Sequence, residues 1–523
     1  MSSETTSAPI PLPQCAVVVH PDDNVAVVKF GLMGDECVAL DDGRELALRG
    51  PVPPGHRFAT VDVPAGDYVR QYGQPIGTSL GVVAGDPISH DNMSDEVPVV
   101  RELPEGLSTP APDYFEPSEV GTFQGYRRSD GRVGTRNHVL IVPASMCAAH
   151  EASQIATLAE FTLLNKEQFP NVDSVVAITH NKGCGMSDGT NVDVMLRVLS
   201  NYADHPNVGG LIFMELGCEM TNLSRLKAYL KKGGLNFEKP VAWLGVQDSG
   251  GSEGVIQAGL EAVKEMLPQV NEATREECSV SELILGVKCG GSDGFSGLSA
   301  NPSLGHASDL LVRSGGTVLL TEVPEFCGAE HVLAQRAKDA ETGREVYGLV
   351  DWFKEYAGRF GSKLGDNPSP GNKAGGLLNI TIKSLGAIAK GGTTRVEGTV
   401  GYAERPAQKG LNLMLGPGYD QESTPGLVGS GATVVVFTTG RGTTIGNAIA
   451  PVIKLASNTP IFERMKGDLD VSAGGVVDGT ESIEECGRRV FDHVVRVAGG
   501  EPAHAERHKH REFQFWAEQS VSL

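Results

Sequence analysis

The sequence has few features of a secreted, membrane-bound or nucleic-acid-binding protein. No run approaches the ~18 consecutive apolar residues that a membrane-spanning helix needs. The first residues, MSSETTSAPIPLPQ, lack the basic and apolar regions of a secretory signal peptide, so we expect residues 1–13 to form a disordered tail. Positive charge is scarce, because 44 Lys and Arg residues face 65 Asp and Glu residues, a formal net charge of −21. These absences argue against a membrane or nucleic-acid partner and favour a cytoplasmic protein.

Two common cofactor and metal motifs are also missing. The nine cysteines are scattered through 523 residues without a CxxC pair, which argues against a zinc ribbon, a thioredoxin-like site or a disulfide framework. The dinucleotide fingerprint G-x-G-x-x-G does not follow the first predicted strand of either α/β region. We therefore expect reduced thiols and no NAD.

The residue pattern divides the chain into three folded parts. Residues 14–93 predict a small β module, because short apolar stretches such as NVAVVKF alternate there with Gly and Pro. Residues 94–125 are acidic and rich in Pro, which is typical of an extended linker. Beyond the linker, apolar strands alternate with helices, and this predicts two α/β lobes with largely parallel sheets, residues 126–278 and 279–523.

Four cysteines come just after predicted strands. They are Cys147, Cys184, Cys218 and Cys289. Open α/β sheets bind ligands outside the carboxyl ends of their strands, so these positions predict a metal site built from thiolates. Iron, an iron–sulfur cluster or zinc would suit such ligands, with His180 as the nearest imidazole. The alternative is a packing role, since free cysteine is commonly buried and inert.

Glycine-rich loops supply further candidate binding segments. The block GVKCGGSDGFSGLSANPSLG, residues 286–305, surrounds Cys289 with glycines that let backbone approach a ligand closely. NPSPGNKAGG and TTGRGTT each combine glycines and hydroxyls with one cation, Lys373 and Arg441 respectively. Such loops bind carboxylate or phosphate groups, although plain turns remain the alternative reading.

With these motifs in view, the sequence resembles the altronate/galactarate dehydratase family over nearly its whole length. HPDDNVAVV and GHRFA resemble the family's N-terminal SAF-type β-clip. The remaining motifs follow in family order: SDGRVGTRNH, HNKGCG, LGCE, CGGSDGFSGLSANPSLG, LTEVPEFCGAE, NPSPGNKAGG, KSLG and FTTGRGTTIG. The fold class expected is α/β, with a SAF-like β module before two lobes.

The resemblance implies an enzyme that removes water from a hexonate or hexarate and yields a 2-keto-3-deoxy acid. It implies a divalent metal, typically Fe²⁺, with an iron–sulfur cluster or Mn²⁺ as alternatives, a sugar-acid substrate, and a homo-oligomer, taken as a dimer. The four cysteines named above and His180 fall on the family pattern. The other cysteines do not, so they are read as packing or surface thiols: Cys15, Cys37, Cys278, Cys327 and Cys486.

One motif departs from the family. Residues 89–92 read SHDN where the family commonly has His-x-His-Asn, although His20 still matches. His90 and Asp91 would replace the two histidines only in part. This departure leaves open which sugar acid is the substrate.

Dehydration next to a carboxylate needs a proton acceptor and groups that stabilise negative charge. His180 is the leading candidate base, with Lys383 and Glu322 as alternatives. The candidate substrate-binding residues are His20, His90, Arg136, Asn137, Gly290, Gly291, Ser292, Asp293, Lys373 and Arg441. Two rival functions are a sulfo-lyase that releases sulfite from sulfolactate and a non-catalytic sugar-acid-binding protein.

Overall fold

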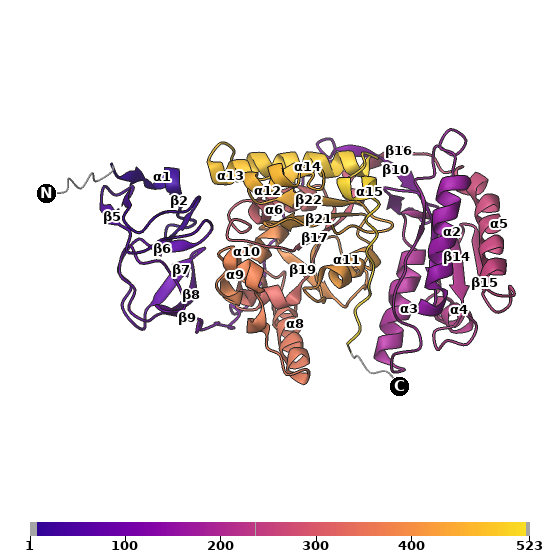
Figure 1. Cartoon of the computed structure of the whole chain (residues 1–523), viewed down its shortest axis with the longest axis horizontal. Coiled ribbons are helices and arrows are strands. Elements are labelled where there is room, and N and C mark those ends of the chain that lie inside the picture. The colour runs from indigo at the N-terminus through magenta and orange to yellow at the C-terminus, as the bar shows by residue number, and fades with distance from the viewer. Residues whose placement is uncertain (1–7, 236, 519–523) are drawn as a thin grey trace.

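The computed structural model describes residues 8–235 and 237–518. Three parts follow one another along the long axis of the molecule (Figure 1). The N-terminal β module lies at one end, the lobe formed by the C-terminal half lies in the middle, and the other α/β lobe lies at the far end. No described helix is long and apolar enough to cross a membrane.

The N-terminal module is built from three small sheets. Their strands are β1 (Ile10–Pro11), β2 (Ala16–Val17), β3 (Val25–Val28), β4 (Cys37–Ala39), β5 (Glu45–Ala47), β6 (Arg57–Ala59), β7 (Tyr68–Gln71), β8 (Gln74–Ser79) and β9 (Met93–Ser94). Part of the segment expected to be a disordered tail, residues 1–13, is ordered. Residues 1–7 lie outside the described part, but β1 pairs with β4, and α1 (Leu12–Cys15) follows because Leu12 and Cys15 are buried in the module's core.

The acidic, Pro-rich segment crosses the middle lobe without a helix. Arg101 pairs there with Glu330 at 2.8 Å and with Asp351 at 2.7 Å. The Phe115 N–H donates to the carbonyl of Arg313. The segment is therefore held against the lobe, and its role as a linker stays a prediction.

The first α/β lobe holds a four-stranded parallel sheet in the order β13-β12-β14-β15. Every residue of β12 is buried, which explains its continuous apolar sequence. The strands are β12 (His138–Pro143), β13 (Val175–Ala177), β14 (Val208–Glu215) and β15 (Val241–Gly245), and the helices are η1 (Met146–Ala148), α2 (Ala149–Thr162), α3 (Thr190–Ala203), α4 (Leu223–Lys232) and α5 (Ser252–Val270).

The second lobe holds a seven-stranded parallel sheet in the order β19-β20-β18-β17-β21-β22-β23. These strands are β17 (Ile284–Cys289), β18 (Thr317–Leu320), β19 (Val396–Val400), β20 (Gly410–Met414), β21 (Val434–Thr439), β22 (Val452–Ala456) and β23 (Val471–Ser472). The helices are η2 (Val280–Glu282), α6 (Ala300–Arg313), η3 (Val323–Phe326), α7 (Glu330–Ala334), α8 (Ala340–Arg359), η4 (Leu364–Asp366), α9 (Pro370–Ala374), α10 (Ile380–Ile388), η5 (Ala389–Gly391), α11 (Asp420–Gly429), α12 (Thr459–Arg464), α13 (Gly474–Asp478), α14 (Ile483–Ala498) and α15 (His504–Arg507). The two parallel sheets and the β module confirm the predicted fold class.

The lobes are joined by a small sheet and by buried polar contacts. In that sheet β10 (Thr122–Arg127) pairs with β11 (Val133–Gly134) and β16 (Glu276–Ser279). Asn207 donates a hydrogen bond from Nδ2 to the carbonyl oxygen of Ile449 at 2.8 Å. The Thr135 hydroxyl donates to the carbonyl oxygen of Thr433, also at 2.8 Å. The chain after α15 runs between the two lobes (Figure 1).

Candidate active site

A pocket of about 470 Å³ opens at the carboxyl edge of the seven-stranded sheet. It lies where an open α/β sheet is expected to bind a ligand. Its lining comes from segments far apart in the sequence: Cys289, Gly290, Gly291, Pro324, Glu325, Lys363, Leu364, Asn367, Ser369, Asn372, Lys383, Gly418 and Asp420. Gly290, Gly291 and Lys383 are the sequence-predicted substrate and catalytic residues that line it.

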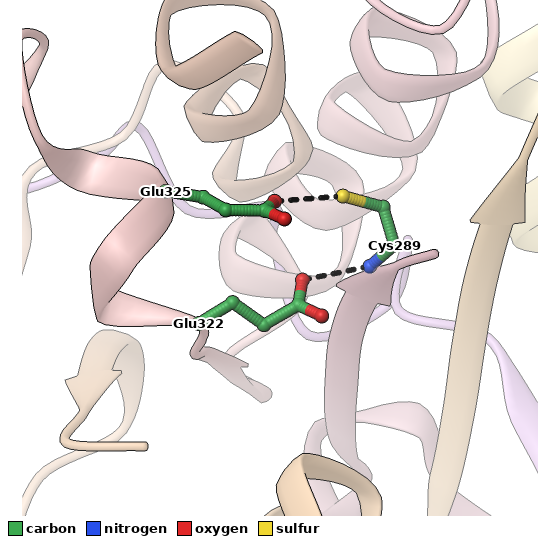
Figure 2. A group of neighbouring side chains, drawn as sticks. All are labelled: Cys289, Glu322 and Glu325. Atoms are coloured by element: carbon green, nitrogen blue, oxygen red, sulfur yellow. Dashed lines mark hydrogen bonds between the residues drawn. The ribbon is translucent and has the colours of Figure 1, made fainter. Parts of the chain in front are cut away.

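Cys289, Glu322 and Glu325 form a buried group beside this pocket (Figure 2). Cys289 ends β17, Glu322 follows β18, and Glu325 lies in η3. The Cys289 N–H donates to Glu322 Oε2 at 2.8 Å, and its thiol donates to Glu325 Oε2 at 3.0 Å. One ligand atom from each residue lies within 4.8 Å of the others, so the group could hold a metal ion.

Three lysines surround the same group. Lys288 Nζ lies 3.0 Å from Glu322, and Lys390 Nζ lies 3.2 Å from Glu322 and 2.7 Å from Cys289 Sγ. Lys383 Nζ lies 2.8 Å from Glu325. Because buried charges are costly without partners, these pairs explain how the six ionisable residues share one interior site.

Burial and the neighbouring charges set the protonation states of Cys289, Glu325 and Lys383. Burial and the nearby Glu325 raise the pKa of the Cys289 thiol, which stays protonated at neutral pH. Burial opposes ionisation of Glu325, but the ammonium groups of Lys383 and Lys390 outweigh it and lower its pKa to about 2. Burial likewise opposes the charge of Lys383, yet Glu325 and the other acidic groups raise its pKa. Lys383 therefore lines the pocket as a positively charged ammonium group.

The donor set of the group fits a transition metal. One sulfur and two carboxylates suit a borderline divalent ion such as iron. Ammonium groups of Lys288, Lys383 and Lys390 face carboxylates of Glu322, Glu325 and Asp420. That network is neutral while Cys289 is a thiol, and a divalent ion that displaces the thiol proton would add one positive charge. This charge would favour an anionic substrate in the pocket.

Gly290 explains part of the glycine-rich block. A Cβ atom at this position would lie 2.6 Å from Asp420 Oδ1 and 2.7 Å from Phe437 Cζ. Asp420 in turn pairs with Lys288 at 2.5 Å. The absence of a side chain at Gly290 therefore lets Asp420 and its partner reach the pocket.

The other residues of the block mainly support it. Asp293 is buried and accepts hydrogen bonds from Ser457 at 2.9 Å and Asn458 at 3.0 Å, which ties the loop to the end of β22. The Ser292 carbonyl accepts from Asn372 Nδ2, while its buried hydroxyl has no hydrogen-bond partner among the described residues. Their substrate-binding roles stay predictions.

The two predicted loop cations lie near the pocket and are exposed. Lys373 belongs to α9, next to the pocket residue Asn372. Arg441 donates from its backbone N–H to Gly291 at 2.9 Å, and its Nε lies 3.7 Å from a Cβ built at Gly371. The substrate-binding roles of Lys373 and Arg441 stay predictions.

Arg136 and Asn137 have structural partners outside this pocket. Arg136 is buried and pairs with Glu506 at 2.6 Å, while it also donates to the Val497 carbonyl. Asn137 donates to the carbonyls of Asn171 and Val270. The structure does not bring either residue to the lining of the pocket around Cys289.

The three predicted histidines also lie elsewhere. His20 and His90 are exposed on the N-terminal module, where His90 Nε2 lies 3.3 Å from Asp95. His180 is buried in the first lobe, with Nε2 2.9 Å from the Pro143 carbonyl and Nδ1 accepting from the Lys182 N–H. Burial lowers the pKa of His180 to about 4. Its role as a base stays a prediction.

The four cysteines are divided between two sheets, so they do not form one site. Cys289 is buried in the second lobe, whereas the other three are exposed in the first lobe. The division arises because the chain crosses between lobes after Cys218. Cys15, Cys278 and Cys486, which were read as packing or surface thiols, are buried.

Sequence reasoning missed four residues of the network: Lys288, Glu325, Lys390 and Asp420. A lysine in the apolar stretch LILGVKC was one available signal, because a charge inside a buried strand needs partners. Glu325 was visible only as a second acid three residues after Glu322.

Comparison with known proteins covers nearly the whole chain. Three domain descriptions match in order: Altronate/galactarate dehydratase SAF domain (residues 14–96), D-galactarate dehydratase/Altronate hydrolase, second domain (125–271), and D-galactarate/Altronate dehydratase, C-terminal (280–521). Galactarate dehydratase (L-threo-forming) from Escherichia coli strain K12 is 36% identical over 489 residues, 92% of each chain. The chain belongs to the altronate/galactarate dehydratase family.

Two further relatives bear on the chemistry of this dehydratase family member. Altronate dehydratase from Bacillus subtilis strain 168 is 33% identical over 500 residues, 95% of this chain and 97% of the relative. The (2R)-sulfolactate sulfo-lyase subunit beta from Chromohalobacter salexigens is 33% identical over 395 residues, but these are only 75% of this chain. The chain is thus an enzyme of the dehydratase, or hydro-lyase, type.

Proposed function

We propose that this enzyme dehydrates a sugar acid, altronate or galactarate, to a 2-keto-3-deoxy acid in the pocket beside Cys289. The observation that carries the proposal is a charged lysine, Lys383, in a pocket that also contains carboxylates and borders a group able to hold a metal. The names of its relatives, galactarate dehydratase and altronate dehydratase, support both the reaction type and the substrate class.

Lys383 is the proton donor of the proposal. Asn367 accepts a hydrogen bond from its Nζ at 2.9 Å, and Glu325 pairs with it at 2.8 Å, so the ammonium group is held in one place. A fixed ammonium group can bind the substrate carboxylate or protonate the departing hydroxyl. Either act lowers the barrier to losing hydroxide.

Asp420 is the proton acceptor of the proposal. Its carboxylate lines the pocket at the start of α11 and is paired with Lys288 at 2.5 Å. Glu322 is fully buried and bound to Lys288, Lys390 and the Cys289 N–H, which suits it to hold these groups in position. A base in the pocket is expected to contribute ~10²–10⁴-fold to the rate.

A divalent metal belongs to the proposal, with Fe²⁺ favoured by the family resemblance and Mn²⁺ as the alternative. Cys289, Glu322 and Glu325 would hold it, and it would supply a Lewis acid for the negative charge that develops beside the substrate carboxylate. Ammonium groups of Lys288 and Lys390 would then share the remaining charge of the carboxylates.

The test is product formation from a panel of aldonates, aldarates and sulfolactate, with Fe²⁺ present and oxygen excluded. The proposal predicts keto-acid formation from altronate or galactarate without added nicotinamide cofactor, and no sulfite from sulfolactate. Absence of keto acid from every aldonate and aldarate would contradict it. Sulfite release would favour the sulfo-lyase, and binding without turnover the non-catalytic alternative.

A further inference from the structure

The three cysteines of the first lobe lie after neighbouring strands. The strand order β13-β12-β14 puts the carboxyl ends of these parallel strands side by side. Cys184 follows β13, Cys147 follows β12, and Cys218 follows β14. Each cysteine therefore reaches the same edge of the sheet from a different loop.

Contacts join the three loops that carry these cysteines. The Met146 N–H donates to the Lys182 carbonyl at 2.7 Å, which joins the loops of Cys147 and Cys184. The Ser145 hydroxyl donates to Glu219 at 2.9 Å, which joins the loops of Cys147 and Cys218. Gly183 packs against Ser145 so closely that a Cβ atom there would lie 2.4 Å from Ser145 Cβ.

Glu219 acts as a positioning residue for this edge. Besides Ser145, its carboxylate accepts hydrogen bonds from the N–H groups of Leu216, Gly217 and Cys218, at 2.7, 2.7 and 2.9 Å. Because Glu219 is buried and accepts these hydrogen bonds, it fixes the backbone that carries Cys218.

The three thiols are exposed and unbonded. Within residues 8–235 and 237–518, no hydrogen bond to the sulfur of Cys147, Cys184 or Cys218 is found, and all three side chains face solvent. Free cysteines that only pack are usually buried, as Cys278 is in β16. Three exposed thiols at one edge indicate a ligand.

The spacing of the thiols favours a cluster over a single ion. Two sulfurs bound to one ion at about 2.3 Å are at most about 4.6 Å apart. No group of three ligand atoms within 4.8 Å includes these sulfurs in the described part of the chain. His180, the nearest imidazole in the sequence, already uses both ring nitrogens on backbone groups. A cluster of several irons accepts thiolates that lie farther apart than one ion allows.

The electrostatic surroundings suit a negatively charged cluster. Three helices begin just after the cysteine loops: α2 at Ala149, α3 at Thr190 and α4 at Leu223. Their N-termini place partial positive charge at this edge.

We propose that Cys147, Cys184 and Cys218 bind an iron–sulfur cluster in the first lobe, separate from the metal group at Cys289. Three thiolates leave one position of a four-thiolate cluster open to an external ligand such as water. The C-terminal segment reaches the loop of Cys184, since the ring of His180 lies 5.1 Å from that of Phe515.

The test measures iron and acid-labile sulfide in full-length protein that has been purified anaerobically and reconstituted with iron and sulfide. Wild-type protein should contain sulfide and show the visible absorption of a cluster. Cys147→Ser, Cys184→Ser and Cys218→Ser should each lose most of the sulfide, with thermal unfolding almost unchanged because the residues are exposed. Cys289→Ser and the buried control Cys278→Ser should keep the sulfide.

Three outcomes would overturn the proposal: no sulfide in the reconstituted wild-type protein, bound zinc in its place, or sulfide retained in all three first-lobe variants. A disulfide between two of the cysteines, detected by thiol counting under denaturing conditions, would also count against it. Because sulfide is measured without turnover, this result is independent of whether the enzyme dehydrates a sugar acid.

Discussion

Gly290 is the residue on which the shape of the pocket depends most simply. Gly290→Ala would place a methyl group 2.6 Å from Asp420 Oδ1 and 2.7 Å from Phe437, so Asp420 must move away from Lys288. We expect at least a roughly tenfold loss of kcat/KM, because a displaced catalytic group is costly. The loss should appear in steady-state kinetics on the substrate found in the panel.

The control for that change is Gly348→Ala. Gly348 is exposed in α8, and a Cβ atom there would meet nothing within 4 Å. Alanine should stabilise the helix by ~0.5–1 kcal/mol and leave activity unchanged. If Gly290→Ala is as active as this control, the close approach at Gly290 has no catalytic meaning.

At the scale of elements, the N-terminal module is a support for the pocket. The Arg57 guanidinium, fully buried in β6, donates from Nη2 to the Gly376 carbonyl at 2.6 Å. Gly294 lies so close to the module that a Cβ atom there would be 2.1 Å from the Gly55 carbonyl oxygen. Gly294 and Gly376 belong to the two glycine-rich segments in which other residues line the pocket.

We therefore expect Arg57→Met to reduce kcat/KM by roughly tenfold or more, since a buried charged hydrogen bond is worth ~1.5–3 kcal/mol. Arg49→Met, an exposed position of the same module, is the matched control and should retain full activity. Kinetics and thermal unfolding of both variants separate a loss of activity from a loss of stability. Full activity of Arg57→Met would show that the module is only an attached domain.

The elements were predictable where the sequence pattern is strong. Continuous apolar strands such as residues 138–143 predicted the parallel sheets, and the glycine block predicted a close approach at Cys289. The division of the four cysteines was not predictable, because every parallel strand has the same kind of carboxyl end and the pattern does not tell which sheet a strand joins. The contacts of Lys390 with Cys289 and Glu322 join residues 101 and 68 positions apart in the sequence, separations that no local pattern encodes.

At the scale of the whole molecule, a buried histidine contributes to the contact between the two lobes. His205 Nε2 lies 3.2 Å from the Ala432 carbonyl of the second lobe. Burial, with Arg405 and Arg132 nearby, lowers the pKa of His205 well below 6.5. The unfolded chain therefore takes up the proton first, so the stabilisation is present above pH ~6.5 and is lost as the pH falls below it.

This linkage predicts how stability changes with pH. Between about pH 7.5 and 5.5, protonation of His205 in the unfolded chain should remove about 1 kcal/mol from the free energy of unfolding. His205→Gln, which keeps a donor and an acceptor, should lose about 1 kcal/mol less than wild type over this range. Urea unfolding at both pH values measures the difference. Equal losses in the two proteins would show that His205 is not the titrating group.

The state of assembly belongs to the same scale. A homo-oligomer, taken as a dimer, and a cytoplasmic location stay predictions from the sequence and its family resemblance. Sedimentation of the purified chain tests the first, and fractionation of the source cells tests the second.

The most direct test of the central claim compares keto-acid formation by wild-type enzyme and Lys383→Gln on the same sugar acid. Glutamine keeps a hydrogen-bond donor for Asn367 but removes the charge that binds or protonates the substrate. We predict a loss of roughly 10²-fold or more in kcat, with unchanged turnover in Lys466→Gln, an exposed lysine outside the pocket. Turnover by Lys383→Gln within about twofold of wild type, in a folded protein, would show that this pocket is not the active site.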